Sequence, residues 1–144
     1  TDFIFLRNGQ ARGQLDDQIA TFIEKAQEAG ANIGLMTFSS MRVSRGKMLT
    51  CAVNMVRQCK FNLRLIYVGK RGHITEQRKD VEHEAEVLAK EHRFLDVEGA
   101  DFGTLFNFID VFIVHGGLGT TVEALRKKKP VAVTGPMLMD QRFR

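Results

Sequence analysis

The sequence predicts an α/β domain in which a parallel sheet is covered by helices on both faces. Strand-like apolar runs alternate with helix-like segments along the whole chain, which favours parallel strands joined by helical crossovers. The run Val111–Val114 shows no polar alternation, as expected for a strand buried on both faces. A glycine-rich loop follows this run directly, in the position where α/β sheets bind ligands.

Length and composition fit one domain. The chain has 144 residues, of which 44% are hydrophobic and 26% are charged, and such a balance is typical of globular proteins. No apolar run is long enough for a membrane span, and no secretory signal opens the chain. Because the chain begins with Thr1, we expect a piece of something longer. Residues 1–14 have turn and linker chemistry, and residues 15–144 form the domain.

The cysteines and the net charge limit which cellular compartment and which kinds of partner we expect. Cys51 and Cys59 point to different faces, so we expect no mutual disulfide and a reducing, cytoplasmic compartment. The net charge of +4 suits an anionic ligand, a nucleic acid or an anionic membrane surface. The basic residues are interspersed with acidic ones, which favours a solvated basic surface, and we do not expect a nucleic acid partner.

The first half of the domain predicts helix, strand and helix. Residues 15–29 carry apolar side chains at amphipathic spacing, and Gly30 closes that helix. Residues 33–38 predict a strand, after which Ser39 and Ser40 supply hydroxyls for capping or for a ligand. Residues 47–58 predict a helix with a buried side and with methionines as core filler; that side comprises Met48, Cys51, Ala52, Met55 and Val56.

The second half continues the alternation. Residues 63–68 predict a strand ended by Gly69, and residues 74–92 predict a charged surface helix. A short strand over 93–97, a loop over 98–103 and a short helix over 104–109 lead to Val111. The three histidines of this region lack the i, i+4 spacing of a helical zinc site, so we expect no metal; they are His73, His83 and His92.

The segment 111–141 carries most of the functional information. Three glycines within positions 116–119 let the backbone approach a ligand closely. Thr120 as N-cap and Glu123 at N3 predict a capping box, with Lys127–Lys129 in the last turn and Pro130 as the stop. A second apolar run, 131–134, predicts the next strand. Free N–H groups and the positive end of a helix then lie at the end of a strand, which favours a phosphorylated ligand.

This segment is neither G-x-G-x-x-G nor Walker A, but it does resemble a known signature. His115-Gly-Gly-Leu-Gly-Thr-Thr-Val-Glu, then Lys-Pro, then Asp140-Gln141, resembles the donor-binding signature of UDP-dependent glycosyltransferases of the two-domain GT-B fold, closest to the sterol and lipid type. The segments that start at Phe38 (FSSM) and Thr104 (TLFN) resemble two further family turns. The resemblance spans roughly residues 15–141 and implies a Rossmann-like half of a GT-B fold.

The resemblance also implies roles for individual residues. His115, Gly119 and Thr120 would hold the diphosphate and stabilise charge on the departing UDP. Glu123 would accept hydrogen bonds from the ribose, and Asp140 with Gln141 from the sugar. Ser40 and Gly117 complete the implied donor site. The UDP-sugar is a substrate, so no cofactor is implied.

The family pattern places the acceptor pocket and the general base in another domain, so no catalytic residue can be assigned here. We therefore interpret the chain as the donor-binding half of an inverting transferase that moves a hexose from a UDP-sugar to a hydroxyl acceptor. An N-terminal half or a partner subunit would complete it, and peripheral membrane contact would be compatible with the lipid-type resemblance. As this fragment alone, it is expected to be inactive.

Two alternatives remain open. One is the catalytic half of a split UDP-GlcNAc transferase, whose signature ends in Asn-His-Gln and which Asp140-Gln141 argues against. The other is a retired transferase-like domain serving as a structural subunit. Departures from the pattern support this second alternative: Ser39 replaces a glycine, and Thr104 stands where the sterol type has Trp. Lys127–Lys129 also replace a stretch of small residues.

Overall fold

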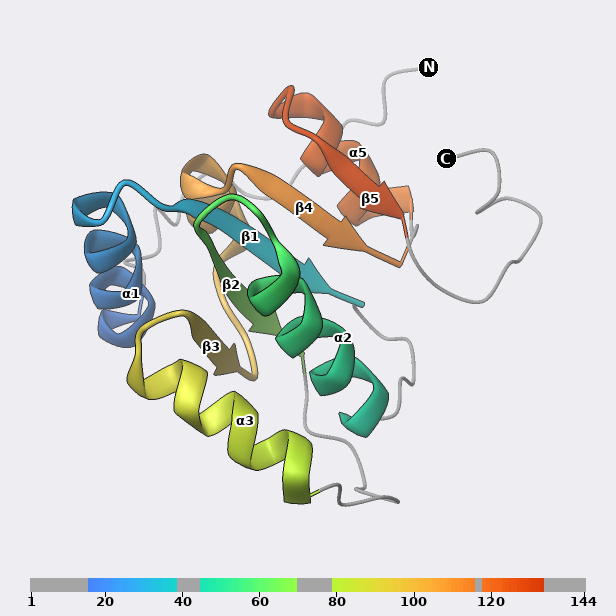
Figure 1. Ribbon diagram of the computed structural model, residues 1–144. Coiled ribbons are helices and arrows are strands. Elements are labelled where there is room, and N and C mark those ends of the chain that lie inside the picture. Colours follow the sequence, from blue (N-terminus) through green and yellow to red (C-terminus); the bar gives the residue numbers. More distant parts are fainter. Residues whose placement is uncertain (1–15, 39–44, 70–78, 116–117, 134–144) are drawn as a thin grey trace.

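The sheet has five parallel strands in the order β3-β2-β1-β4-β5 (Figure 1). The computed structural model describes residues 16–38, 45–69, 79–115 and 118–133. Every pairing is parallel, which confirms the predicted fold class. The strands are β1 (Asn32–Thr37), β2 (Leu63–Val68), β3 (Phe94–Val97), β4 (Val111–Val114) and β5 (Val131–Val133).

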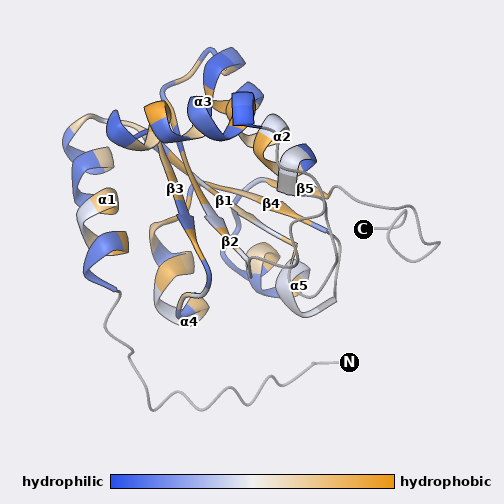
Figure 2. Cartoon of the chain, turned by 90° about the horizontal axis from the view of Figure 1, so that it is seen from below, coloured by the Kyte–Doolittle hydropathy of each residue, from blue (hydrophilic) through white to orange (hydrophobic). Residues whose placement is uncertain are grey.

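Helices cover both faces of this sheet, and each face has its own core. One cluster of buried side chains joins the sheet to α2 and α3, which lie side by side in Figure 1. The other joins it to α1, α4, a 3-10 helix η1, and α5. Figure 2 shows the hydrophobic colour concentrated between these layers and the hydrophilic colour on the outside of α1 and α3. The helices are α1 (Asp17–Glu28), α2 (Arg45–Gln58), α3 (Lys79–Lys90), α4 (Phe102–Leu105), η1 (Phe106–Phe108) and α5 (Leu118–Arg126).

β1 is the central strand, since it pairs with β2 on one side and with β4 on the other. Its residues from Ile33 to Thr37 are buried, as an apolar run between two helical layers requires. Asp110 fixes the start of the β1–β4 pairing. Its backbone N–H donates to the Ile33 carbonyl at 2.8 Å, and its Oδ2 accepts from the Ile33 N–H at 2.9 Å.

α1 agrees closely with its sequence pattern. Asp16 caps it by accepting a hydrogen bond from the Gln18 N–H at 3.4 Å. Gly30 follows the helix with φ of +63°, a conformation that glycine adopts without the cost a Cβ would impose. Its apolar stripe is buried, as predicted; the stripe comprises Ile19, Phe22, Ile23 and Ala26.

α2 buries three of the five side chains predicted for its buried side, Met48, Ala52 and Val56, and two others were predicted wrongly. Cys51 was expected on the buried side, but it is exposed, and Met55 is only half-buried. The buried side chains come instead in pairs of adjacent residues, spaced one turn apart. This wider stripe is buried because both the sheet and α3 pack against the helix. It comprises Met48, Leu49, Ala52, Val53 and Val56. Cys51 and Cys59 are both free thiols.

α4 begins two residues before the predicted position, inside the stretch expected to be a loop. The cause is Asp101, whose side chain accepts from the Gly103 N–H at 3.1 Å and from the Thr104 hydroxyl at 2.8 Å. An aspartate so placed satisfies the free N–H groups of a first turn. The ring of Phe106 then packs against that of Phe112 on β4, with centroids 4.8 Å apart.

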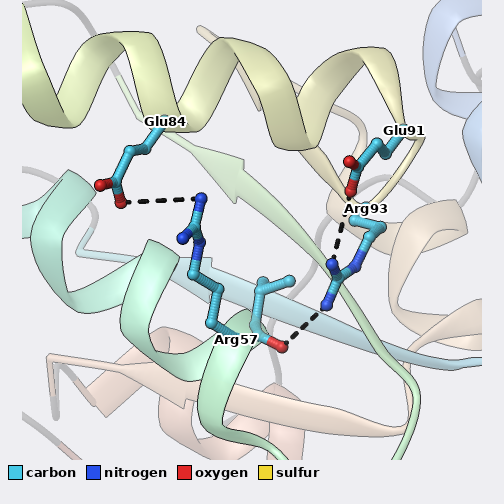
Figure 3. Close-up of polar contacts among 5 residues, drawn as sticks. Arg57, Glu84, Glu91 and Arg93 are labelled. Atoms are coloured by element: carbon cyan, nitrogen blue, oxygen red, sulfur yellow. Dashed lines mark hydrogen bonds and ion pairs between the residues drawn. The ribbon is translucent and has the colours of Figure 1, made fainter.

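Two arginines tie α2 to the α3–β3 unit, as Figure 3 shows. Arg57 on α2 lies 3.9 Å from Glu84 on α3. Arg93 lies 3.4 Å from Glu91 and also donates to the Val56 carbonyl, at the end of α2, at 3.3 Å. Because these pairs are about half-exposed, each is worth only about 0.2–1 kcal/mol, and the buried apolar contacts dominate this packing.

The Asp110 clamp gives a test of the fold. We expect Asp110→Ala to lower the free energy of unfolding by about 1–3 kcal/mol, because the part-buried Ile33 N–H loses its acceptor. Asp110→Asn retains an acceptor oxygen and should cost less. Urea denaturation of both variants measures the difference. Equal losses would show that the charge near Lys129, 4.0 Å away, matters more than the hydrogen bond.

Candidate functional site

The candidate site lies where the strand order reverses, between the carboxyl ends of β1 and β4. β1 and β4 end level, since Thr37 and Val114 are register partners. The helices that follow them, α2 after β1 and α5 after β4, pack on opposite faces of the sheet. In open α/β sheets this divergence forms the crevice in which ligands bind.

Buried polar side chains gather at this position. In the described part of the chain, the polar side chains classed as buried are Thr37, His115 and Thr121, at 1%, 8% and 3% exposure. Thr37 ends β1, His115 follows β4, and Thr121 lies in α5. A polar group in an apolar core costs free energy unless it is hydrogen-bonded. These three residues come from the elements that flank the switch point, which makes them candidates for a site.

Burial changes the ionisation of His115. Desolvation lowers the pKa of its imidazole below the ordinary value of 6.5, because removing water disfavours the charged form. The ring is therefore neutral at pH 7. A neutral imidazole presents one N–H donor and one acceptor nitrogen, so it can still donate a hydrogen bond to an anion.

α5 begins three residues earlier than predicted, since Thr120 as N-cap would make Thr121 its first residue. Its first residue is Leu118, so Thr120 lies within the first turn and is not the N-cap. The predicted capping box is therefore wrong. The helix starts directly after the two glycines 116 and 117, and Leu118 and Gly119 both continue its helical geometry. As a result the backbone N–H groups of the first turn, which have no intrahelical acceptors, begin three residues after His115.

Glu123 consequently has a different role from the predicted one. It lies five residues past the start of α5, roughly 7.5 Å along the axis at about 1.5 Å per residue. It cannot cap that helix end. Its side chain is 29% exposed and its Oε1 lies 3.6 Å from Nη1 of Arg126, a pair at i, i+3 spacing.

The lysine run also differs from its prediction. α5 ends at Arg126, so Lys127–Lys129 lie beyond its last turn, in the connection to β5. Lys128 has φ of +55°, which ends the helix before Pro130 is reached. Lys127 donates to Oδ1 of Asn107 in η1 at 2.7 Å. The lysines therefore occupy the edge of the sheet opposite the candidate site.

Four of the predicted site residues lie outside the described residues: Ser40, Gly117, Asp140 and Gln141. Of the others, the structure brings His115, Gly119 and Thr120 to one edge of the sheet, with Glu123 farther along α5. Thr104 is engaged in capping α4 through Asp101. No cluster of three potential metal ligands occurs among the described residues.

Sequence reasoning missed Thr37 and Thr121. A usable signal existed for Thr121, because it lies three residues before the fully buried Ala124 and hence on the buried stripe of the helix. Thr37 is the last residue of a buried apolar strand, and a hydroxyl there is level with the end of its neighbour β4. The signal for Thr121 can be used only when the start of α5 is known, and the signal for Thr37 only when β4 is known to pair with β1.

The helices of the described segments are too short or too polar for any of them to cross a membrane. No family model matches the chain.

In sequence, the chain is similar to a sterol 3-beta-glucosyltransferase of Yarrowia lipolytica. The identity is 31% over 143 residues, which is 99% of this chain and 10% of that protein. The chain thus spans about a tenth of the length of this relative.

In structure, the chain is similar to three solved proteins. The glycotransferase of kitacinnamycin matches with a TM-score of 0.56 and 19% identity, over 79% of this chain and 27% of that one. Anabaena HepE, solved with UDP and glucose, matches with a TM-score of 0.52 and 22% identity, over 79% of this chain and 33% of that one. A Listeria monocytogenes protein described as a putative UDP-N-acetylglucosamine 2-epimerase matches with a TM-score of 0.51 and 15% identity, over 85% of this chain and 31% of that one. These likenesses establish the fold, which an epimerase and a transferase share.

The buried His115 predicts a pH dependence of stability. Its pKa is about 6.5 in the unfolded chain and lower in the folded one. Between those values the unfolded state binds a proton that the folded state does not, so the free energy of unfolding should fall as the pH drops below 6.5. Urea denaturation from pH 7.5 down to 5 measures this loss. His115→Gln should remove this component, whereas the same change at the exposed His83 serves as the control and should leave it in place.

Proposed function

We propose that this chain, which is homologous to a sterol 3-beta-glucosyltransferase and shares its fold with a glycotransferase, is the donor-binding domain of a UDP-sugar glycosyltransferase. The observation that carries the proposal is the convergence of His115 and the first turn of α5 at the switch point between β1 and β4. This arrangement suits a diphosphate, and the sequence relationship supplies the class of donor.

The diphosphate would lie across the first turn of α5. Its N–H groups and the positive end of the helix favour a negatively charged ligand. The hydroxyl of Thr120, half-buried in this turn, adds a donor. The neutral ring of His115 would donate its N–H to a phosphate oxygen from the β4 side. Donors fixed in this way stabilise the charge that develops on the departing UDP.

The ribose would lie farther along α5, beside Glu123. The carboxylate of Glu123 is held near Arg126 in the structure, and this pair is partly exposed and weak. Vicinal ribose hydroxyls offer stronger, charge-assisted hydrogen bonds once a ligand excludes water. We therefore propose that Glu123 exchanges Arg126 for the ribose when the donor binds.

The sugar end of the site is assigned from the sequence resemblance. Asp140 and Gln141 would accept hydrogen bonds from the hydroxyls of a hexose, and Ser40 and Gly117 would complete the phosphate contacts. These four residues lie outside the described ranges. Inversion at the anomeric carbon is part of the same proposal.

Transfer needs more than donor binding, because the acceptor oxygen must be positioned and must lose its proton. We propose that residues 15–144 supply the donor site, that residues 1–14 connect it to another part of the protein, and that the acceptor site and the base lie there or in a partner subunit. The length of the relative, of which this chain spans 10%, is consistent with this division. On its own the chain should bind the donor without transferring it.

A structural role without catalysis is the second candidate function. It is favoured by Thr104, whose hydroxyl donates to Oδ2 of Asp101 at 2.8 Å, where the sterol type has a Trp. A threonine engaged in capping gives no aromatic surface on which a base could stack. Binding of UDP separates this candidate from the transferase.

We expect the chain to bind UDP, and we expect Glu123→Ala to weaken that binding roughly 10- to 100-fold. This is the effect of losing a charge-assisted hydrogen bond, about 1.5–3 kcal/mol. Isothermal titration calorimetry measures it. His115→Ala should weaken binding as well, by removing a phosphate donor.

The corrected start of α5 makes Glu123→Ala a clean test. The variant loses no helix cap, only an i, i+3 pair worth about 0.2–0.5 kcal/mol, so its melting temperature should barely change. Glu84→Ala is the matched control, since Glu84 forms a similar exposed pair with Arg57 on the opposite face of the sheet. Affinity for UDP that is equal in all these proteins would exclude the proposed site, and absent binding would favour the structural role.

Asp140 should select the sugar rather than the nucleotide. In the protein that carries this chain, Asp140→Ala should weaken use of UDP-glucose roughly 10- to 100-fold through loss of a charge-assisted hydrogen bond. Inhibition by UDP should stay nearly unchanged. Steady-state kinetics with UDP as a competitive inhibitor separates the two effects. If the variant loses affinity for UDP to the same degree, Asp140 contacts the nucleotide instead.

A further inference from the structure

The surface at the amino-terminal ends of the strands lies opposite the candidate site. In a parallel sheet all the connections that enter strands lie on this one side, and in Figure 1 they lie at the tails of the arrows. We call this surface the amino edge. It comprises residues 29–31, 59–62, 91–93, 106–110 and 127–130.

The exposed large apolar side chains of the described residues gather at this edge. Phe61 is 73% exposed, Leu125 is 58% exposed and Phe108 is 38% exposed. Phe61 and Phe108 belong to the amino edge itself, and Leu125 lies in the last turn of α5, which leads into it. Scattered exposed apolar residues are ordinary, whereas a group of them on one surface indicates an interaction site.

Hydrogen bonds show that these connections are neighbours. The Asn32 N–H donates to the Asn62 carbonyl at 2.8 Å, which places the Phe61 turn beside the start of β1. The adjacent Ile33 exchanges two hydrogen bonds with Asp110, at the end of the η1 segment. η1 in turn is joined to Lys127 through Asn107. The surface therefore runs continuously from the β2 side to the α5 side.

This surface is also positively charged. Its described residues include two carboxylates, Glu91 and Asp110, and five cationic side chains. The cations are Lys60, Arg93 and Lys127–Lys129. Arg93 pairs with Glu91 at 3.4 Å, and Lys129 lies 4.0 Å from Asp110. The hydrogen-bond partner of Lys127 is the neutral Asn107. Lys60 and Lys128 form no ion pair within the described part of the chain, so the positive excess is not internally compensated.

We propose that the amino edge docks on an anionic lipid surface, with its exposed apolar side chains at the headgroup level and its lysines against lipid phosphates. Lysines around exposed apolar groups suit such a surface, which attracts cations and accepts apolar side chains at its boundary. An identical positive surface on a second copy would be repelled. Nucleic acid fits less well, because the aliphatic Leu125 cannot stack on bases. The carboxyl edge would face away from the lipid, so this docking does not depend on the proposed donor site.

A single tryptophan gives a direct test, because the chain contains none. Phe61→Trp should fold normally, since the side chain at this position is 73% exposed. We expect its emission to shift to shorter wavelength with vesicles of phosphatidylcholine plus phosphatidylserine, but not with phosphatidylcholine alone. High salt should reverse the shift.

The lysines can be tested against a matched pair. In the Phe61→Trp background, Lys128→Asn with Lys129→Gln should weaken vesicle binding about fivefold for each charge removed. Asn suits position 128, where φ is +55°. The control, Lys47→Gln with Lys79→Gln, removes two exposed charges near the starts of α2 and α3, at the other edge, and should change binding less than about twofold.

Three results would overturn the proposal. Emission that does not respond to anionic vesicles would exclude contact through Phe61. An equal loss in both lysine pairs would indicate attraction by net charge alone, without a defined surface. A shift that depends on protein concentration in the absence of vesicles would assign the surface to self-association. None of these measurements involves UDP, so failure here leaves the donor site untouched.

Discussion

The pairing of β1 with β4 is the constraint on which the candidate site depends. Ile33 and Asp110, which join at the start of this pairing, are 77 positions apart in the sequence. Closing so long a loop is entropically unfavourable, and burial of β1 on both faces offsets it. The backbone and the side chain of Asp110 each form a hydrogen bond with Ile33. These bonds set the register at the start of the two strands, and the same register pairs Thr37 with Val114 at their other end. A slip of one residue would turn each side chain of β4 to the other face.

The buried polar residues show how the fold accommodates a site within an apolar sheet. Thr37, His115 and Thr121 occupy positions where the surrounding core would accept apolar side chains. A polar group in such surroundings needs a hydrogen-bond partner, because leaving it without one costs about 1–3 kcal/mol. Burial also lowers the pKa of the His115 imidazole, because removing water disfavours its charged form.

The parallel topology separates two kinds of surface. Every strand ends at the carboxyl edge, where glycines and the start of α5 lie, and every strand begins at the amino edge, where lysines and exposed phenylalanines lie. The two surfaces are separated by the length of the strands, so the ligands proposed for them would not compete. Composition gives only the net charge of +4, whereas the topology places three of the positive charges, Lys127–Lys129, together at the amino edge.

The sequence alone determined the alternation of strands and helices and the buried face of α1. These features depend on local periodicity and on glycine and cap chemistry, which short stretches such as Val111–Val114 encode by themselves. Element ends were less well determined. α4 starts early because Asp101 caps it, and α5 starts at Leu118, before the predicted cap Thr120.

Only the tertiary structure decided which strands are neighbours, which side chains are buried and where each charge lies. β1 lies between β2 and β4 although β3 precedes β4 in the chain, and periodicity carries no information on that order. Cys51 is exposed and Thr121 is buried because the layers that pack on α2 and α5 choose the buried stripe among several that the helices could offer. The site and the amino edge both arise from such choices, since each combines residues from segments that meet only when the sheet forms.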